Sequence, residues 1–460
     1  ASTFSNLVVG SGSFVHSGSG ALTLTAQNTF TGTTSISSPG ATLILSDSLN
    51  LQSSTLNHDS TGGSLSIGTL TAVTLGGLSG DRNLVLENTT PAAVGLTVGG
   101  NNSSTTYSGG LGGSGSLTKN GTGVLTLTGA NTYTGNTVAN AGDLDISAGG
   151  SLTSRPAGSP TPTGRVVGSG GNLAATTGNF GVGTPGLLVS GGTAAFSGAV
   201  TAAGSTGSTN SGLVKVTGGT LTMASLALGR GGLNASTEPA SAPVDTNLYI
   251  SGGAVTITGN LNIGTANSVP NSSVVTRVDG GSLTVGGGIV VGLNNGGRWS
   301  ILDVNGGDLF STATAVGSGI VLGGPNQGNA VFLVRAGTAT TERIQFGQAA
   351  VGGAGVVNLL GGTLYMGAGG FNLGTTGAYT AEIRLTGGTL AAKAPWTTSF
   401  PINVAGTNHS VVRTADANDN PFDITLNGAL TGTGALDKEG SGTLTLGGGH
   451  SYTGATTVYA

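Results

Sequence analysis

The middle of the chain reads Thr276-Arg277-Val278-Asp279-Gly280-Gly281-Ser282-Leu283 and, soon afterwards, Leu302-Asp303-Val304-Asn305-Gly306-Gly307-Asp308-Leu309. In both stretches a Gly-Gly pair follows a short segment of alternating character. The positions two and four before the pair are apolar in nearly every copy, whereas the position between them is mixed and often charged. Alternation with a period of two predicts a β-strand with one face buried and the other exposed.

The pattern recurs through the middle of the chain at intervals of about 25 to 34 residues. Its glycine pairs begin at Gly191, Gly218, Gly252, Gly280, Gly306, Gly361 and Gly387, with a degenerate Ala336-Gly337. A second strand follows each pair, and a third ends at glycine. Such a unit cannot bury its apolar side chains alone, but stacked units can. We therefore expect an all-β chain forming a right-handed parallel β-helix (β-solenoid), with about three short strands per coil and no substantial helix. In it, Val216, Val278 and Val304 should share one interior column.

The repeats divide the chain into four regions. We expect residues 1–150 to form a β-helix that carries two copies of a longer motif. Residues 151–185 are predicted to be a Pro- and Gly-rich insertion with an irregular coil. Residues 186–392 should form the regular Gly-Gly β-helix, and residues 393–460 the terminal coils with a third copy of the longer motif.

Composition excludes several functional classes. Glycine supplies 90 of 460 residues and charged residues only 7%, which argues against helical bundles and coiled coils. The absence of cysteine excludes disulfides, thiolate metal sites and cysteine catalysis. The net charge of −4 is scattered, so we expect no nucleic-acid partner. No apolar run has the length of a membrane-spanning segment.

The longer motif occurs three times and aligns without gaps. The copies read GSFVHSGSGALTLTAQNTFTGTT (12–34), GSLTKNGTGVLTLTGANTYTGNT (115–137) and GALDKEGSGTLTLGGGHSYTGAT (434–456). They resemble the autotransporter-associated β-strand repeat, also called the passenger-associated transport repeat, with its G-L-x-K-x-G-x-G-x-L-x-L stretch and following N-x-Y-x-G-x-T. Lys119 and Lys438 match the family lysine, whereas His16 departs from it. The resemblance implies a large secreted β-helical passenger on a bacterial surface, without one particular activity.

These observations favour an extracellular structural protein that forms a cell-surface rod, fibre or sheath. The open ends of such a β-helix favour head-to-tail self-association or continuation into the remainder of a longer passenger. An adhesin that binds glycans or other cells is the alternative. A polysaccharide-degrading enzyme is a third and less favoured hypothesis, because the 18 acidic residues are spread along the chain. We expect no catalytic residues, no cofactor and no metal site.

One outward ladder carries charged and polar side chains. It consists of Lys215, Tyr249, Arg277, Asp303, Leu333, Asn358 and Arg384. Arg277 and Asp303 should be stacked neighbours, which predicts an exposed ion pair of little energetic weight.

The densest acidic segment is Asp416–Asp423, which faintly resembles a calcium loop with oxygen ligands at alternate positions. Pro421 stands where such a loop needs glycine, so a polar turn between strands is the favoured interpretation and calcium binding is left open. The four histidines, which are His16, His58, His409 and His450, have no metal-ligand spacing. His16 and His450 lie in the longer motif, so solvated repeat positions are the favoured interpretation.

Three glycine-poor insertions interrupt the repeats, at 155–165, 234–247 and 393–402. Loops on a solenoid are common binding sites. Trp396 and Phe400 in the third insertion could stack on sugars, but we favour a role in covering a coil edge. The same interpretation applies to Trp299 beside Arg298.

Overall fold

A computed structural model describes residues 1–135, 137–153, 166–168, 172–180, 185–202, 213–229, 247–264, 274–293, 299–313, 319–324, 328–348, 352–374 and 379–459. Every regular element within these ranges is a β-strand, and the strand ladders are parallel, which confirms the all-β prediction. None of the described segments forms a helix with the length and apolarity needed to cross a membrane. The chain divides into two compact units, which are residues 1–200 with 219–222, and residues 201–218 with 223–460.

The first strands in chain order are β1 (Ser2–Phe4), β2 (Phe14–His16), β3 (Ala21–Leu24), β4 (Thr33–Ile36), β5 (Thr42–Leu45), β6 (Leu51–Asn57), β7 (Ser64–Ser66), β8 (Ala72–Ser79), β9 (Leu84–Val85), β10 (Gly95–Val98), β11 (Thr105–Tyr107), β12 (Leu111–Gly112), β13 (Ser116–Lys119), β14 (Val124–Leu127), β15 (Thr137–Ala139), β16 (Asp143–Thr153), β17 (Val166–Gly168), β18 (Asn172–Phe180), β19 (Pro185–Val189) and β20 (Thr193–Ala202).

The later strands are β21 (Leu213–Val216), β22 (Thr220–Leu228), β23 (Leu248–Ile257), β24 (Leu261–Ile263), β25 (Val275–Val285), β26 (Ile289–Val291), β27 (Trp299–Ser311), β28 (Ile320–Leu322), β29 (Asn329–Phe346), β30 (Gly353–Leu359), β31 (Thr363–Leu373), β32 (Tyr379–Leu385), β33 (Thr389–Ala392), β34 (Trp396–Thr398), β35 (Ile402–Val404), β36 (Ser410–Arg413), β37 (Ile424–Leu426), β38 (Leu430–Thr431), β39 (Leu436–Glu439), β40 (Leu444–Leu446) and β41 (Thr456–Val458).

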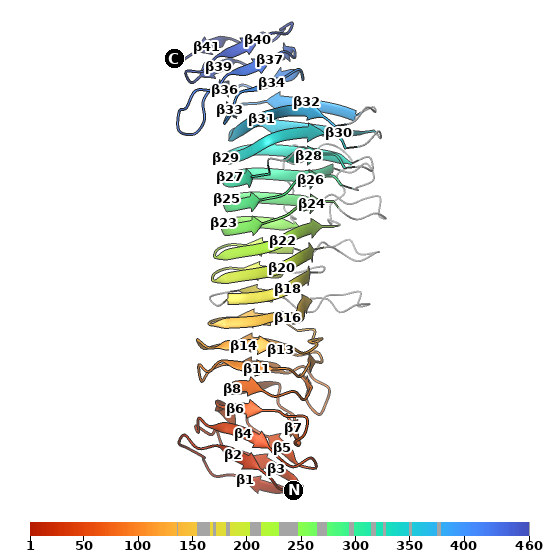
Figure 1. Cartoon of the computed structure of the whole chain (residues 1–460), viewed down its shortest axis with the longest axis vertical. Helices are drawn as coiled ribbons and strands as arrows, with labels where there is room; N and C mark the ends of the chain where they lie inside the picture. The colour runs from red at the N-terminus through yellow and green to blue at the C-terminus, as the bar shows by residue number, and fades with distance from the viewer. Residues whose placement is uncertain are drawn as a thin grey trace. The chain divides into compact units, whose positions relative to one another are not determined.

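In the first unit most strands pair in parallel with a strand of the neighbouring repeat, so that successive layers lie on one another (Figure 1). One ladder runs β2–β4–β6–β8, and another runs β1–β3–β5–β7. The second ladder places Phe4, Leu24 and Leu45 at paired positions. Leu24 and Leu45 are buried, as expected for the inward positions of alternating strands.

The ladder of β1, β3, β5 and β7 ends at β7, whereas β9 pairs only with β12 among the described strands. The backbone amides of Leu84 and Leu86 donate to Gly110 and Gly112, on the β12 side of β9. The amide of Ser64 in β7 donates to Ala41, on the β5 side. Between β7 and β9 the regular pairing is therefore interrupted.

The second unit contains the interior column that the sequence predicts. Paired positions lead from strand to strand through Val216, Ile250, Val278, Val304, Val334, Leu359, Leu385 and Val404. All eight side chains are fully buried. Glycine closes the corners beside this column: Gly281 has a φ of 67°, and a Cβ there would lie 2.2 Å from the carbonyl oxygen of Gly253. The prediction that Val216, Val278 and Val304 share one column is confirmed.

The prediction that residues 393–402 interrupt the strands is wrong, because these residues contain regular strands. β34 lies within these residues and pairs with β37, and β35 begins at their end. Glycine is scarce there because large side chains fill the interior, as described below for Trp396. Residues 155–165, which form the first insertion, and residues 234–246 of the second insertion lie outside the described residues.

Candidate functional site

The family lysine of the longer motif has a structural role. Lys119 is only 1% exposed, at a position paired with Val98 and Ala139. Its Nζ donates to the carbonyl oxygens of Asn120 at 2.6 Å and Gly121 at 2.9 Å. Burial lowers the pKa of Lys119, and the charge of Asp143 opposes that effect. The ammonium group thus bonds two backbone carbonyl oxygens of the glycine turn that follows β13.

The other two copies also place a side-chain donor on a backbone carbonyl of the following turn. Lys438 Nζ donates to the carbonyl of Gly440. His16 takes the lysine position in the first copy, and its Nε2 lies 2.9 Å from the carbonyl oxygen of Gly20, a contact in which the ring nitrogen donates. His16 therefore departs from the motif in residue type but keeps the turn-bonding role. The sequence interpretation of His16 as solvated is wrong, since it is 9% exposed.

The second half of the motif links each copy to residues 20 positions earlier. Asn131 Oδ1 accepts the backbone N–H of Leu111 at 3.1 Å, and Asn28 Oδ1 accepts that of Val8 at 2.9 Å. His450 substitutes for asparagine, and its Nδ1 accepts the N–H of Leu430 at 3.1 Å.

The glycine of the T-G-x-T stretch also packs on the residue 20 positions earlier. A Cβ on Gly135 would lie 2.2 Å from the carbonyl oxygen of Gly115, so only glycine fits this contact. Gly32 and Gly454 make equivalent contacts with Gly12 and Gly434. The tyrosine of the motif then bonds the threonine that follows, as in the 2.6 Å contact between the Tyr133 hydroxyl and Thr137 Oγ1.

The outward ladder of the second unit has the predicted register but not the predicted exposure. Arg277 and Asp303 are paired residues, as expected. Their charged atoms are 4.0 Å apart, and Asp303 is fully buried. Its nearer partner is Arg335, whose Nε lies 3.0 Å from Oδ1. The expected exposed ion pair is thus a buried carboxylate between two arginines, because neighbouring side chains cover this part of the sheet.

Asp279 lies beside this pair and completes a polar cluster. It accepts hydrogen bonds from Arg277 at 2.5 Å, Tyr249 at 3.0 Å and Asn305 at 3.0 Å. Burial alone would raise the pKa of Asp279, but these hydrogen bonds hold it below its usual value. Burial raises the pKa of Asp303 despite both arginines. The cluster consists of carboxylates committed to arginine, tyrosine and asparagine, an arrangement typical of structural polar networks.

Apolar side chains cover the outward face next to this cluster. The members are Val275, Trp299, Ile301, Val331, Leu333 and Val356. Trp299 is 8% exposed, which fits the predicted covering role, and Arg298 lies outside the described residues. Leu333, a member of the predicted outward ladder, is buried by these contacts.

Trp396 is also an interior residue. It is 3% exposed, and its ring centroid lies 5.8 Å from that of Phe371 in an edge-on contact. Phe346 lies 6.3 Å from Phe371 and 5.1 Å from Phe400. Stacking of Trp396 on a sugar is incompatible with this burial, whereas a covering role agrees with it.

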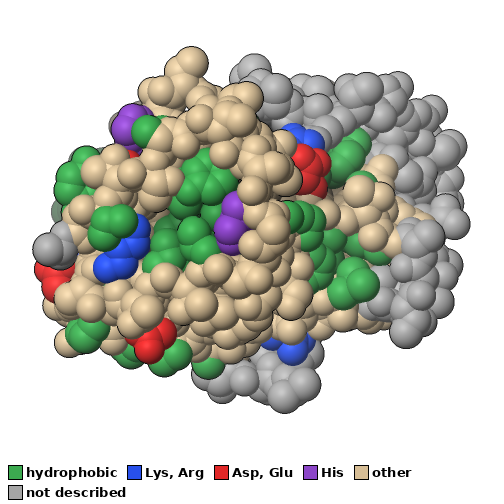
Figure 2. Space-filling model, turned by 90° about the horizontal axis from the view of Figure 1, so that it is seen from above, with side chains coloured by type: hydrophobic (Ala, Val, Ile, Leu, Met, Phe, Trp, Pro, Cys, Tyr) green, Lys and Arg blue, Asp and Glu red, His purple; other side chains and the backbone are tan. Residues whose placement is uncertain are grey.

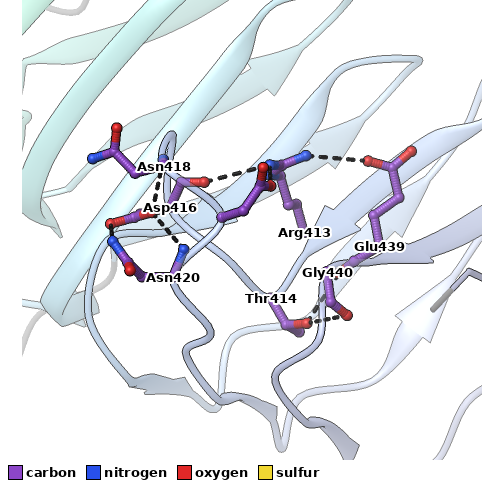
Figure 3. Close-up of polar contacts among 8 residues, drawn as sticks. Arg413, Thr414, Asp416, Asn418, Asn420, Glu439 and Gly440 are labelled. Atoms are coloured by element: carbon purple, nitrogen blue, oxygen red, sulfur yellow. Dashed lines mark hydrogen bonds and ion pairs between the residues drawn. The ribbon is translucent and has the colours of Figure 1, made fainter.

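The acidic segment Asp416–Asp423 forms a hydrogen-bonded turn between β36 and β37 (Figure 3). Asp416 Oδ1 accepts the backbone N–H groups of Asn418 at 2.8 Å and Asn420 at 2.9 Å. Asp416 Oδ2 accepts the side-chain amide of Asn420, the strongest of the interactions that lower the pKa of Asp416. Arg413 contacts Asp419 and lies 3.7 Å from Glu439. The described contacts are those of a polar turn.

His58 is the residue that sequence reasoning misjudged most. It is 2% exposed, and neither ring nitrogen has a hydrogen-bond partner in the described part of the chain. Burial, followed by the charge of Arg82, lowers its pKa to about 4. No sequence signal marked it, because the residue lies just after β6 and outside the glycine repeat. His409 and His450 are exposed, as predicted, although His409 Nδ1 lies 3.0 Å from Asp437.

Comparison with known families identifies the longer motif. The family model described as Passenger-associated-transport-repeat matches residues 14–46, 117–146 and 436–460. These are the three regions that share the turn and 20-residue contacts described above. No curated protein and no solved structure shows significant similarity to the chain. Among the described residues, no group of three or more histidine, aspartate or glutamate side chains is arranged to hold a metal ion.

Proposed function

We propose that this protein is an extracellular structural β-solenoid of the autotransporter-passenger type. The observation that carries the proposal is that all three family-matched segments make the same contacts with residues 20 positions earlier. The repeat family is associated with passengers, which supports a secreted or surface protein. Side chains such as Lys119 then serve to close turns rather than to act on a ligand.

The proposed architecture is a right-handed parallel β-helix with about three short strands per coil. The parallel ladders and the aligned columns of both units support it. A right-handed coil is proposed because connections between parallel strands of one sheet are right-handed in nearly all proteins. A structural rather than an enzymatic role is part of the proposal, since Asp279 and Asp303 are occupied by hydrogen-bond donors.

Location provides the direct test. Antibodies raised against the purified chain should label intact cells of the producing organism or recover the protein from the culture medium. External protease should remove the cell-surface signal, whereas a cytoplasmic control protein should stay protected. Labelling that requires permeabilised cells, with no protein in the medium, would contradict the proposal.

Head-to-tail self-association is a second proposal. Among the described strands β41 pairs only with β39, and its last residue Val458 and the following Tyr459 are 72% and 50% exposed. Figure 2, which views the second unit from the C-terminal side, shows hydrophobic side chains gathered in the middle of this end. A strand edge with exposed apolar side chains favours pairing with another strand, which a second copy or a further length of the same chain can supply. Electron microscopy should show filaments of stacked copies, and discrete particles at high concentration would argue against them.

A further inference from the structure

The corner after β6 combines a buried titratable ring with an interruption of the strand ladder. His58 is 2% exposed, and its ring nitrogens have no hydrogen-bond partner of ordinary geometry in the described part of the chain. Two turns adjoin it: the first turn is residues 59–63 and the second turn is residues 80–83. The strands that follow these turns, β7 and β9, do not pair with each other, and an open groove of about 670 Å³ lies between them.

Arg82 links the first turn to the second turn. Its guanidinium donates to the backbone carbonyl oxygens of Asp59 at 3.1 Å, Ser60 at 2.9 Å and Gly62 at 2.6 Å. Its backbone N–H donates to the carbonyl oxygen of His58 at 3.0 Å. The corner is therefore held together by bonds from one side chain to a turn, and not by the pairing of two strands.

Asp81 adds a second link between the two turns. Its carboxylate accepts the backbone N–H of Ser60 at 2.6 Å and the Ser60 hydroxyl at 2.8 Å. These two hydrogen bonds are the main reason that the pKa of Asp81 is lowered. The carboxylate of Asp81 stays ionised in mild acid, so acid does not weaken this link by protonating it.

The buried ring of His58 is less stable in its charged form. Burial, followed by the charge of Arg82, lowers the pKa of His58 to about 4, whereas the backbone of Arg82 and the charge of Asp81 oppose the shift. A protonated ring would place a charge and two N–H donors without acceptors beside the guanidinium of Arg82. Contact with water removes this cost, so protonation favours displacement of the turns that adjoin the ring.

The remaining titratable groups of the corner are two carboxylates and a phenol. Asp59 belongs to the first turn, and Glu87 lines the groove. The hydroxyl of the fully buried Tyr107, in β11, donates to the carbonyl oxygen of Arg82. Burial raises the pKa of Tyr107, so this contact carries no charge in acid. Any acid effect of Asp59 or Glu87 persists in a chain that lacks only the ring of His58.

We propose that the corner is an acid-opened switch, in which protonation of His58 separates the first turn from the second turn while the ladders on either side stay paired. The interrupted ladder permits this local opening, because β7 and β9 share no pairing that has to break. The switch goes beyond the structural role proposed above, and it concerns the first unit alone.

Hydrogen–deuterium exchange of the full purified chain at pH 7 and pH 4 tests the proposal, with labelling times corrected for the intrinsic effect of pH on amide exchange. Protection of the two turns should fall about a hundredfold, a limit set by the shift of the His58 pKa from 6.5 to about 4. Strands β5 and β14 should keep their protection. So should Gly286 and Gly287, whose amides donate to Ile257 and Gly259 at 2.8 Å in a turn of the second unit.

Protection of the two turns that is the same at pH 7 and pH 4 would overturn the proposal. An equal loss in β5 and β14 would also overturn it, because the first unit would then unfold as a whole and not open at the corner.

Two variants without a titratable ring provide the matched comparison. His58→Gln keeps a polar side chain, and His58→Leu places an aliphatic one, as Ile36 does at the preceding position of that column. Both variants keep Asp59, Asp81 and Glu87, and in both the two turns should be equally protected at pH 7 and pH 4. A loss as large as that of the parent chain would assign the effect to the carboxylates and refute the role of His58.

Arg82→Gln tests the link between the turns. The variant loses the hydrogen bonds to the first turn and also the charge that disfavours a protonated His58. Its two turns should be less protected than those of the parent chain at pH 7, and acid should lower their protection by a smaller factor. Parent-like protection at both pH values would contradict the proposed switch.

Discussion

The interior column of the second unit and that of the first unit differ in what they bury. From Val216 to Val404 the second unit stacks only apolar side chains. In the first unit, a column passes from His16 to Ile36 and, by extension of the same register, to His58. Both columns are built on parallel pairing, so the strand pattern alone does not determine how polar an inward position can be.

The difference between the two columns indicates where a buried polar side chain is tolerated. His16 and Lys119 lie beside glycine turns, whose carbonyl oxygens accept their N–H groups. The ring nitrogens of His58 make no such hydrogen bond of ordinary geometry, and the ring is buried after β6, away from the glycine turns of the longer motif. The column from Val216 to Val404 is lined by apolar side chains alone, so a polar side chain placed in it would be buried without a side-chain partner.

The largest effect should follow from placing a charge in the apolar column. Val278→Asp buries a carboxylate without a partner between Ile250 and Val304, and should destabilise the second unit by more than about 4 kcal/mol. Urea unfolding followed by circular dichroism measures the loss. Val458→Asp makes the same change at a 72% exposed position and should be nearly neutral. Equal effects of the two variants would show that Val278 is not in a dry column.

His58 should make the stability of the first unit depend on pH. The pKa of His58 is about 4 in the folded chain and 6.5 in an unfolded chain. Between pH 4 and pH 6.5 the side chain therefore takes up a proton when the protein unfolds. The stabilisation is complete above pH 6.5 and is lost as the pH falls toward 4, by about 3 kcal/mol in total. The charge of Arg82 strengthens the effect, whereas the backbone of Arg82 and the charge of Asp81 oppose it.

The variant His58→Leu isolates this contribution, because it keeps every other titrating group. Its free energy of unfolding should fall less than that of the parent chain between pH 7.5 and pH 4. Parallel curves for the two proteins would show that the ring of His58 is not held neutral by burial.

The two family lysines offer the smallest and most specific comparison. Lys119→Met removes the donor to Asn120 and Gly121 from a buried turn and should cost about 2 kcal/mol. Lys438→Met removes a partly exposed donor, whose carbonyl partner water can reach, and should cost less than half as much. Thermal unfolding of both variants checks the order. A larger loss for Lys438→Met would contradict the assigned role of burial.

Much of the fold could be predicted because its signal is local and repeated. The alternation before each glycine pair identified the strands, and the spacing of the pairs identified which strands are neighbours, as Val278 and Val304 illustrate. The longer motif identified its family because three copies share the same letters. Burial on the outward face was not predictable in this way: Asp303 follows the alternation of an exposed residue, and its cover comes from residues distant in sequence.

By itself, the sequence determined the strand pattern, the parallel register and the repeat family, because each follows from periodic spacing along the chain. Only the tertiary structure decided that Lys119 closes a turn, that Asp303 and Trp396 are buried, and that the ladder opens beside His58. These features depend on which atoms of other strands stand within a few ångströms of a side chain. The spacing of residues along one strand does not specify these neighbours, so the environment of each side chain is set only when the strands pair and pack.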